Sequence, residues 1–174
     1  MFYTKKIFLF AVLFFISCES NSTKKNSLTD LQILESKSSF INLSKQEVDL
    51  KLFSNKKIIL NYWATWCGPC IKEMPDLMNA EKKLKDSDVS LFLVSDEDMS
   101  VISKFVDNNS YTLNFIKSNV SNEMLGVYSL PTTILFDKKG KKVETIVGVL
   151  DFSDDNLINK FLEYWYEKFL SYCI

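Results

Sequence analysis

The sequence predicts an α/β protein, and three consecutive stretches carry that prediction. Residues 58–63 form a continuous apolar run, which is typical of a strand covered on both faces of a sheet. Residues 71–85 follow with apolar side chains at helical spacing, and residues 89–94 are apolar again. This order predicts two parallel strands joined by a helix in a right-handed crossover. The 174 residues, 47% of them hydrophobic, are enough for one folded domain and exclude global disorder.

The N-terminal residues are interpreted as an export signal. Two lysines precede ten apolar residues, a run too short to cross a bilayer, which needs about 20 residues. Residues 15–18 then resemble a bacterial lipobox that ends at Cys18. We therefore expect a lipoprotein signal peptide over 1–17, a lipid anchor on Cys18 and a polar tether over 18–37 that is flexible in its first ten residues. For the later part of the tether, a short helix and a strand edge both stay open. An ordinary cleavable signal and an uncleaved anchor are the alternatives.

Residues 38–174 are expected to form the folded domain. Apolar residues alternate over 40–43 and 48–53, which favours short edge strands or a hairpin. Pro75 lies inside the first helical stretch and is expected to kink that helix. The later elements, in chain order, are a helix over 98–109, a short strand over 113–116, a short helix over 123–127, a hairpin of strands 132–136 and 142–147, and a final helix capped by residues 153–155.

Two cysteines separated by two residues, Cys67 and Cys70, lie where the first buried strand passes into the helix. The N-terminus of a helix carries partial positive charge and unpaired N–H groups, which stabilise a thiolate, so a lowered pKa makes such a cysteine nucleophilic. Pro69 suits the first helical turn. A zinc site would need four ligands, but the sequence has no His, and Cys18 and Cys173 lie near its ends. We therefore favour redox chemistry over a structural pair, and expect neither metal nor cofactor.

Two motifs resemble those of the thioredoxin superfamily. Residues 60–75, which contain Trp66-Cys67-Gly68-Pro69-Cys70, look like the TlpA/ResA-like branch of exported, membrane-tethered thiol–disulfide oxidoreductases. Residues 128–137 look like that family's cis-proline loop running into a strand. The resemblance covers roughly residues 38–170. It implies a thioredoxin-like fold, in which helices flank a central mixed β-sheet.

The resemblance also assigns roles to residues. Cys67, exposed at the start of the helix, would attack a client disulfide, and Cys70, one turn deeper, would resolve the mixed disulfide. Leu130 and Pro131 would bind the client, and the residues that support the site would be Trp66, Gly68, Pro69 and Pro131.

One position departs from cytosolic thioredoxin, because Asn61 stands where thioredoxin has a buried Asp. An Asn side chain cannot take the proton from Cys70. The candidate acceptors are water and the carboxylates of Glu73, Asp96 and Glu97, although each carboxylate is also explained as a charge that complements a helix dipole.

These features predict a thiol:disulfide oxidoreductase of the cell envelope. Its partners would be client protein disulfides, with apocytochrome c one conceivable client, and a membrane electron donor that re-reduces it. A peroxiredoxin-type peroxidase is disfavoured by Ala64 and by the absence of Arg. The alternative is a Cu(I)-handling module, since thiolates suit that ion. A net charge of −1 without a basic stripe gives no support to nucleic-acid binding. The direction of electron flow, the choice of inner or outer membrane and the oligomeric state stay open, and Cys173 is predicted to be a free thiol.

Overall fold

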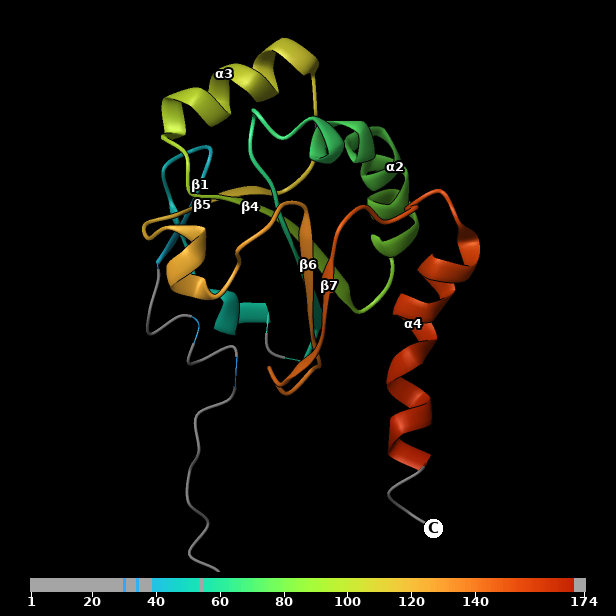
Figure 1. Cartoon of the computed structure of the whole chain (residues 1–174). Helices are drawn as coiled ribbons and strands as arrows, with labels where there is room; N and C mark the ends of the chain where they lie inside the picture. The colour runs from blue at the N-terminus through green and yellow to red at the C-terminus, as the bar shows by residue number, and fades with distance from the viewer. Residues whose placement is uncertain (1–29, 31–33, 35–38, 54, 171–174) are drawn as a thin grey trace, which may run out of the picture.

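The computed structural model describes residues 30, 34, 39–53 and 55–170, and its centre is a mixed sheet of seven strands (Figure 1). The strands are β1 (Phe40–Asn42), β2 (Glu47–Val48), β3 (Lys57–Tyr62), β4 (Val89–Ser95), β5 (Phe115–Ser118), β6 (Thr132–Phe136) and β7 (Lys142–Val147). Their order is β2-β1-β5-β4-β3-β6-β7, in which β3, β4 and β5 run parallel and the other pairs are antiparallel. The predicted α/β class with a central mixed sheet is confirmed.

Between residues 55 and 170 of the described chain, three α-helices connect or follow these strands. They are α2 (Gly68–Leu84), α3 (Met99–Asn109) and α4 (Asp155–Leu170), each close to its predicted position. Helix α2 contains Pro75 and continues for nine residues beyond it, to Leu84. Helix α3 ends before Ser110, which adopts the left-handed conformation.

Two short segments differ from the prediction. The strand expected over 48–53 is wrong beyond Val48, because residues Leu50–Phe53 form the 3-10 helix η1. The Asp49 side chain accepts a hydrogen bond from the backbone N–H of Lys51, and such local bonding favours a turn over a sheet ladder. The short helix expected over 123–127 is the 3-10 helix η2 (Asn122–Leu125), which Gly126 ends in a left-handed conformation.

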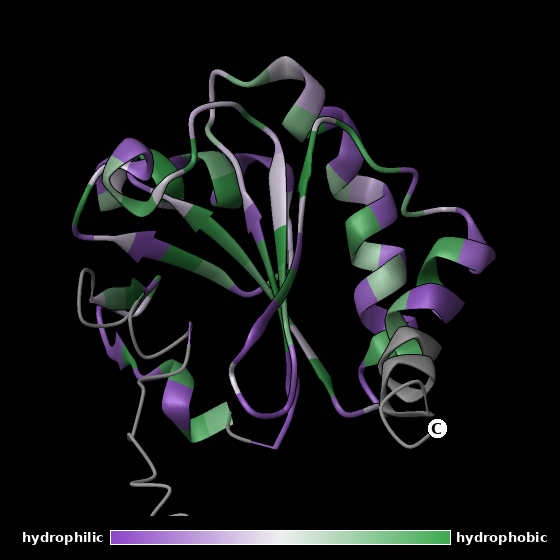
Figure 2. Ribbon diagram, turned by 60° about the horizontal axis from the view of Figure 1, so that its bottom comes forward, coloured by the Kyte–Doolittle hydropathy of each residue, from purple (hydrophilic) through white to green (hydrophobic). Residues whose placement is uncertain are grey.

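The sheet separates two hydrophobic clusters. Apolar residues of α2, α3 and α4 pack against one face, and the other face is covered by Leu34, Leu50 and Val127. Strand β3 is buried along its whole length, as its continuous apolarity predicts, and Figure 2 shows hydrophobic stretches along the central strands. Because β3 and β4 are parallel, their carboxyl ends meet at one edge, and α2 begins there.

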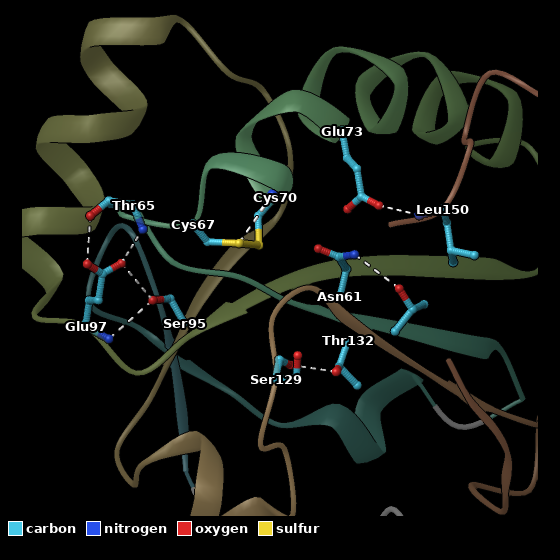
Figure 3. Close-up of a disulfide and its surroundings, with 11 residues drawn as sticks. Asn61, Thr65, Cys67, Cys70, Glu73, Ser95, Glu97, Ser129, Thr132 and Leu150 are labelled. Carbon is cyan, nitrogen blue, oxygen red and sulfur yellow. Dashed lines mark hydrogen bonds between the residues drawn. A yellow bond between two sulfur atoms is a disulfide. The ribbon is translucent and has the colours of Figure 1, made fainter. Parts of the chain in front are cut away.

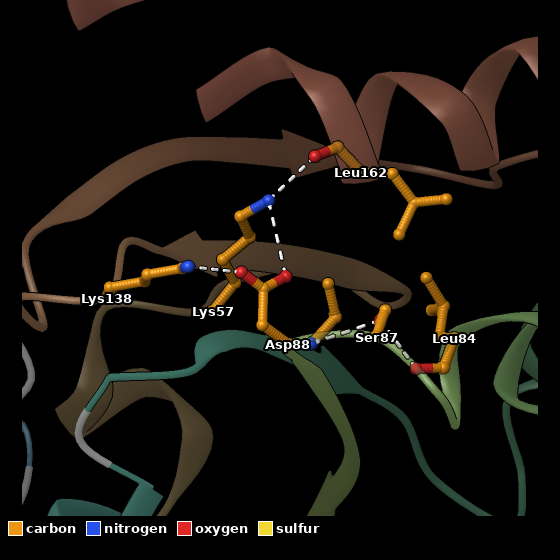
Figure 4. Close-up of polar contacts among 7 residues, drawn as sticks. Lys57, Leu84, Ser87, Asp88, Lys138 and Leu162 are labelled. Atoms are coloured by element: carbon orange, nitrogen blue, oxygen red, sulfur yellow. Dashed lines mark hydrogen bonds and ion pairs between the residues drawn. The ribbon is translucent and has the colours of Figure 1, made fainter. Parts of the chain in front are cut away.

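At the opposite end of β3, a buried cation joins three elements (Figure 4). The ammonium group of Lys57 donates to the backbone carbonyl of Leu162 in α4 at 2.7 Å and lies 3.6 Å from the carboxylate of Asp88. Asp88 also pairs with Lys138. Burial lowers the pKa of Lys57, while the charge of Asp88 opposes that effect. These contacts fasten α4 and the β6–β7 turn to the base of the sheet, far from the cysteine pair.

The predicted signal peptide, the lipidation of Cys18 and the free thiol of Cys173 lie outside the described residues. Of the predicted tether, residues 30 and 34 are described; both are helical, and Leu34 is buried in one of the two hydrophobic clusters. In the part of the chain that is described, no helix is long and apolar enough to cross a membrane.

Candidate active site

A disulfide bond joins Cys67 and Cys70 at the start of α2 (Figure 3). Cys67 is the N-cap of the helix, and its sulfur accepts a hydrogen bond from the backbone N–H of Cys70 at 3.3 Å. Pro69 occupies the first helical turn, where a missing N–H costs nothing. The pair therefore lies at the positive end of a 17-residue helix, as the sequence predicts.

The cysteines are less accessible than expected. Cys67 is 4% exposed and Cys70 is 1% exposed, so the expectation of an exposed Cys67 is wrong for this oxidised form. The physical reason is that both cysteines pack as members of the main hydrophobic cluster. The exposed surface of the motif comes instead from Gly68, Pro69 and Trp66, and Trp66 is 74% exposed.

The loop before β6 lies at the same edge of the sheet. The peptide bond between Leu130 and Pro131 is cis. The Thr132 hydroxyl donates to the carbonyl of Ser129 at 2.7 Å, and the Pro131 carbonyl accepts from the N–H of Gly148 at 2.9 Å. Gly148 has a φ of 103°, which other residues adopt only with strain. Sequence reasoning missed Gly148, and the only signal was a glycine directly after the last strand.

Glu73 is a buried carboxyl group one turn along the helix from Cys70, with 3% of its surface exposed. One oxygen accepts the N–H of Leu150, while the other, Oε2, has no hydrogen-bond partner among the described residues. Burial raises the pKa of Glu73 to about 7, although the Leu150 N–H and the Asn61 amide act to lower it. The Asn61 amide also donates to Thr133 at 3.2 Å. In Figure 3, Glu73 and Asn61 lie on one side of the disulfide and Glu97 lies on the other.

The other two candidate carboxylates are occupied by backbone groups. Asp96 accepts the N–H of Asn122 at 2.8 Å. Glu97 accepts both the N–H and the hydroxyl of Thr65, at 2.6 and 2.7 Å, and a weaker bond from Ser95 at 3.3 Å. Thr65 was not singled out in the sequence, because nothing there indicates a partner 32 positions away. Of the three carboxylates, only Glu73 combines burial with an oxygen that lacks a partner.

This chain is similar to several known proteins. A family model described as Redoxin matches residues 24–158. The thiol-disulfide oxidoreductase ResA of Bacillus anthracis is 38% identical over 112 residues, which cover 62% of this chain and 64% of that protein. The thioredoxin-like protein YneN of Bacillus subtilis is 32% identical over 114 residues, covering 62% and 66%. The chain thus matches less than two thirds of the length of that ResA relative.

Solved structures share the fold. A crystal structure of a putative thiol:disulfide interchange protein DsbE from Chlorobium tepidum superposes with a TM-score of 0.63 at 22% identity. The superposition covers 71% of this chain and 89% of that protein. At this identity the likeness establishes the thioredoxin-like fold.

Proposed function

We propose that this chain is a thiol:disulfide oxidoreductase that reduces client disulfides. It belongs to the Redoxin family and is a TlpA/ResA-like member of the thioredoxin superfamily. The observation that carries the proposal is the Cys67–Cys70 disulfide with Cys67 as the N-cap of α2. A pair that closes reversibly at a helix N-terminus can accept and release two electrons, because the helix stabilises the thiolate that begins each exchange.

The reaction starts from the reduced pair. The Cys67 thiolate attacks one sulfur of the client disulfide, a Cys67–client disulfide forms, and the client's other sulfur leaves as a thiolate that takes a proton from water. Cys70 then loses its proton and attacks the Cys67 sulfur. The Cys67–Cys70 disulfide forms again and the second client sulfur is released, so two electrons have passed to the client. A dithiol donor completes the cycle by the reverse exchange.

Glu73 is the proposed acceptor for the Cys70 proton. Its pKa of about 7 matches a group that exchanges protons near neutrality, and Oε2 is without a partner among the described residues. Cys70 and Glu73 are both buried residues of α2, three positions apart, so they lie on the same face of the helix. The Leu150 N–H holds the carboxyl group in place through its other oxygen, Oε1.

The proposed client surface surrounds the motif. Trp66 is 74% exposed, and Tyr128, close to the cis-proline loop, is 82% exposed. Within the described chain, the backbone of Leu130 makes no hydrogen bond of its own, which leaves it available to an extended client segment. The Gly148 N–H binds the Pro131 carbonyl and so fixes the loop that presents Leu130.

The test is disulfide exchange with purified reduced protein. We expect the wild type to reduce insulin disulfides, Cys67→Ser to be inactive, and Cys70→Ser to accumulate mixed disulfides with its substrate. Substantial reductase activity in Cys67→Ser would refute the assignment of the nucleophile. Cu(I) retention by the same three proteins tests the alternative, and tight Cu(I) binding without reductase activity would favour a copper-handling role.

The cellular setting is also a proposal. We infer that the chain is anchored by lipid at Cys18 on the periplasmic side of the cell envelope, where a membrane electron donor re-reduces it and where apocytochrome c is one candidate client. The support is the lipobox-like run that ends at Cys18. Labelling cells with a palmitate analogue should mark the wild type and not Cys18→Ala. Release of unlabelled wild-type protein in soluble form would leave simple export as the explanation.

A further inference from the structure

We propose that Glu97 is a positioning residue for Cys67, holding the loop before the cysteine pair to the end of β4 through Thr65. This inference rests on the proposed function. The carboxylate uses both oxygens on one residue, since Oε2 accepts the Thr65 N–H at 2.6 Å and Oε1 accepts the Thr65 hydroxyl at 2.7 Å. Figure 3 shows this pair on the Cys67 side of the disulfide.

Ala64 and Cys67 of this loop are buried in the hydrophobic cluster, but few hydrogen bonds reach the loop from elsewhere in the described chain. Strand β3 ends at Tyr62, and the Trp63 N–H makes one further bond to β4, to the Val94 carbonyl at 3.0 Å. Among residues 64–67 of the described chain, the backbone hydrogen bond donated by a loop N–H is a local one, from the N–H of Cys67 to the carbonyl of Ala64. Residue 66 points largely into solvent, so its burial fixes nothing. Glu97 therefore supplies the hydrogen bonds that reach this loop from a distant part of the chain.

The Glu97 carboxylate is itself oriented by Ser95. Ser95, fully buried at the end of β4, donates its hydroxyl to Glu97 at 3.3 Å and accepts the Glu97 N–H at 3.2 Å. Two parallel neighbouring strands are thus linked at their carboxyl ends, through Glu97 after β4 and Thr65 after β3. Two hydrogen bonds to the same residue fix the direction of the loop as well as its distance from β4. This sets where the Cys67 sulfur lies.

The negative charge of Glu97 has an effect opposite to that of its hydrogen bonds. A carboxylate near Cys67 disfavours the thiolate that the helix N-terminus stabilises. The other charged groups around this loop are Asp96, bound to the Asn122 N–H, the N-cap Asp98, and Lys104 of α3, which lines the same open groove as Thr65. Because positioning and charge act in opposite directions, substitutions can separate them.

Glu97→Gln keeps the shape of the side chain, since its carbonyl oxygen accepts the Thr65 N–H and its amide donates to the Thr65 hydroxyl. Glu97→Ala removes both bonds. Asp96→Asn is the matched control, because it removes a neighbouring charge that binds a different loop. Thr65→Val deletes only the hydroxyl bond, and serves as a second variant if Glu97→Ala does not fold.

The readouts are the rate of Cys67 alkylation by iodoacetamide as a function of pH, and the rate of exchange with a small aromatic disulfide. We expect Glu97→Gln to keep the limiting exchange rate within about twofold and to raise alkylation at pH 6 roughly threefold, as removal of one nearby charge implies. Glu97→Ala should lower the limiting exchange rate by about tenfold or more, as misplacement of a reacting group does. Thr65→Val should fall between them.

Two results would overturn the proposal: Glu97→Ala exchanging as fast as the wild type, or Glu97→Gln impaired as severely as Glu97→Ala. Circular dichroism of each variant shows whether a lost rate reflects unfolding. The alkylation profile does not depend on a client, so a wild type that is alkylated normally but exchanges no disulfide counts against the proposed function instead.

Discussion

Replacing Glu73 by Gln should change how stability depends on pH. Glu73 is buried, and its pKa rises from the usual 4.5 to about 7 on folding. Between these two values the folded protein holds a proton that the unfolded chain has released. The free energy of unfolding of the wild type therefore falls as the pH rises through this window, by about 1.4 kcal/mol per pH unit and about 3 kcal/mol in total.

Gln is neutral at every pH and its carbonyl oxygen can accept the Leu150 N–H that Glu73 binds now. The free energy of unfolding of the Glu73→Gln protein does not fall in this pH window. The difference between the variant and the wild type should therefore increase by about 3 kcal/mol between pH 4.5 and pH 7.5. Urea denaturation of the oxidised proteins at a series of pH values measures this difference. Any constant effect of the substitution cancels in the comparison.

Glu123→Gln is a suitable control, since Glu123 is an exposed carboxylate elsewhere on the surface and the change removes the same charge. The reasoning is refuted if the difference between Glu73→Gln and the wild type is the same at both ends of the pH range. In that case Glu73 does not titrate near neutrality, and its role as the proton acceptor for Cys70 fails as well.

Two further substitutions test the energetics away from the cysteines, both by urea denaturation. Asp88→Asn removes the negative charge that lies beside the buried Lys57. We expect a loss of about 1–2 kcal/mol at pH 7, since Asp88 is partly exposed and also pairs with Lys138. Burial raises the pKa of Asp88, but the hydrogen bond and charge of Lys138 and the charge of Lys57 outweigh it, so the folded-state pKa is lowered. The stabilisation of the folded protein by ionised Asp88 is therefore present above pH 3.8 and disappears as the pH falls through the lower folded-state pKa. A loss of stability in Asp88→Asn that is as large at pH 2 as at pH 7 would contradict this. Tyr62→Phe removes a buried hydroxyl without a partner among the described residues, and should raise the free energy of unfolding by about 1 kcal/mol. A clear loss of stability in Tyr62→Phe would mean that its hydroxyl is bonded.

Much of the fold could be predicted because long periodic stretches determine it. The apolar run of β3, the helical spacing of α2 and the apolar β4 leave one arrangement, a parallel crossover. The hairpin of β6 and β7 followed from a Gly-containing turn between two strand-like runs. The segment Leu50–Phe53 was mispredicted, because an alternating pattern of four residues fits a strand and a 3-10 turn equally well, and a side-chain bond from Asp49 favours the turn.

At the site, chemistry that depends on sequence neighbours was predictable and chemistry that depends on tertiary neighbours was not. The pairing of Cys67 with Cys70 and the N-cap position follow from spacing and from the strand–helix boundary. The burial of Cys67 and the contact between Glu97 and Thr65 depend on how α2 packs on the sheet and on where β4 ends. Neither has a local signal, because the residues involved are far apart in the chain or are covered by other elements.

Glu97 and Glu73, which lie on either side of the disulfide (Figure 3), are both carboxylates, but their hydrogen bonds suit them to different roles. A carboxylate whose two oxygens both accept hydrogen bonds from one residue of a loop holds that loop, as Glu97 does with Thr65. A carboxylate buried with one oxygen unpartnered, as in Glu73, is destabilised as an anion and takes up a proton near neutral pH. The first can position a nucleophile, while the second can receive a proton. The two carboxylates lie on opposite sides of the disulfide (Figure 3). In the proposed mechanism they contribute to the same exchange reaction, Glu97 by positioning Cys67 and Glu73 by accepting the proton of Cys70.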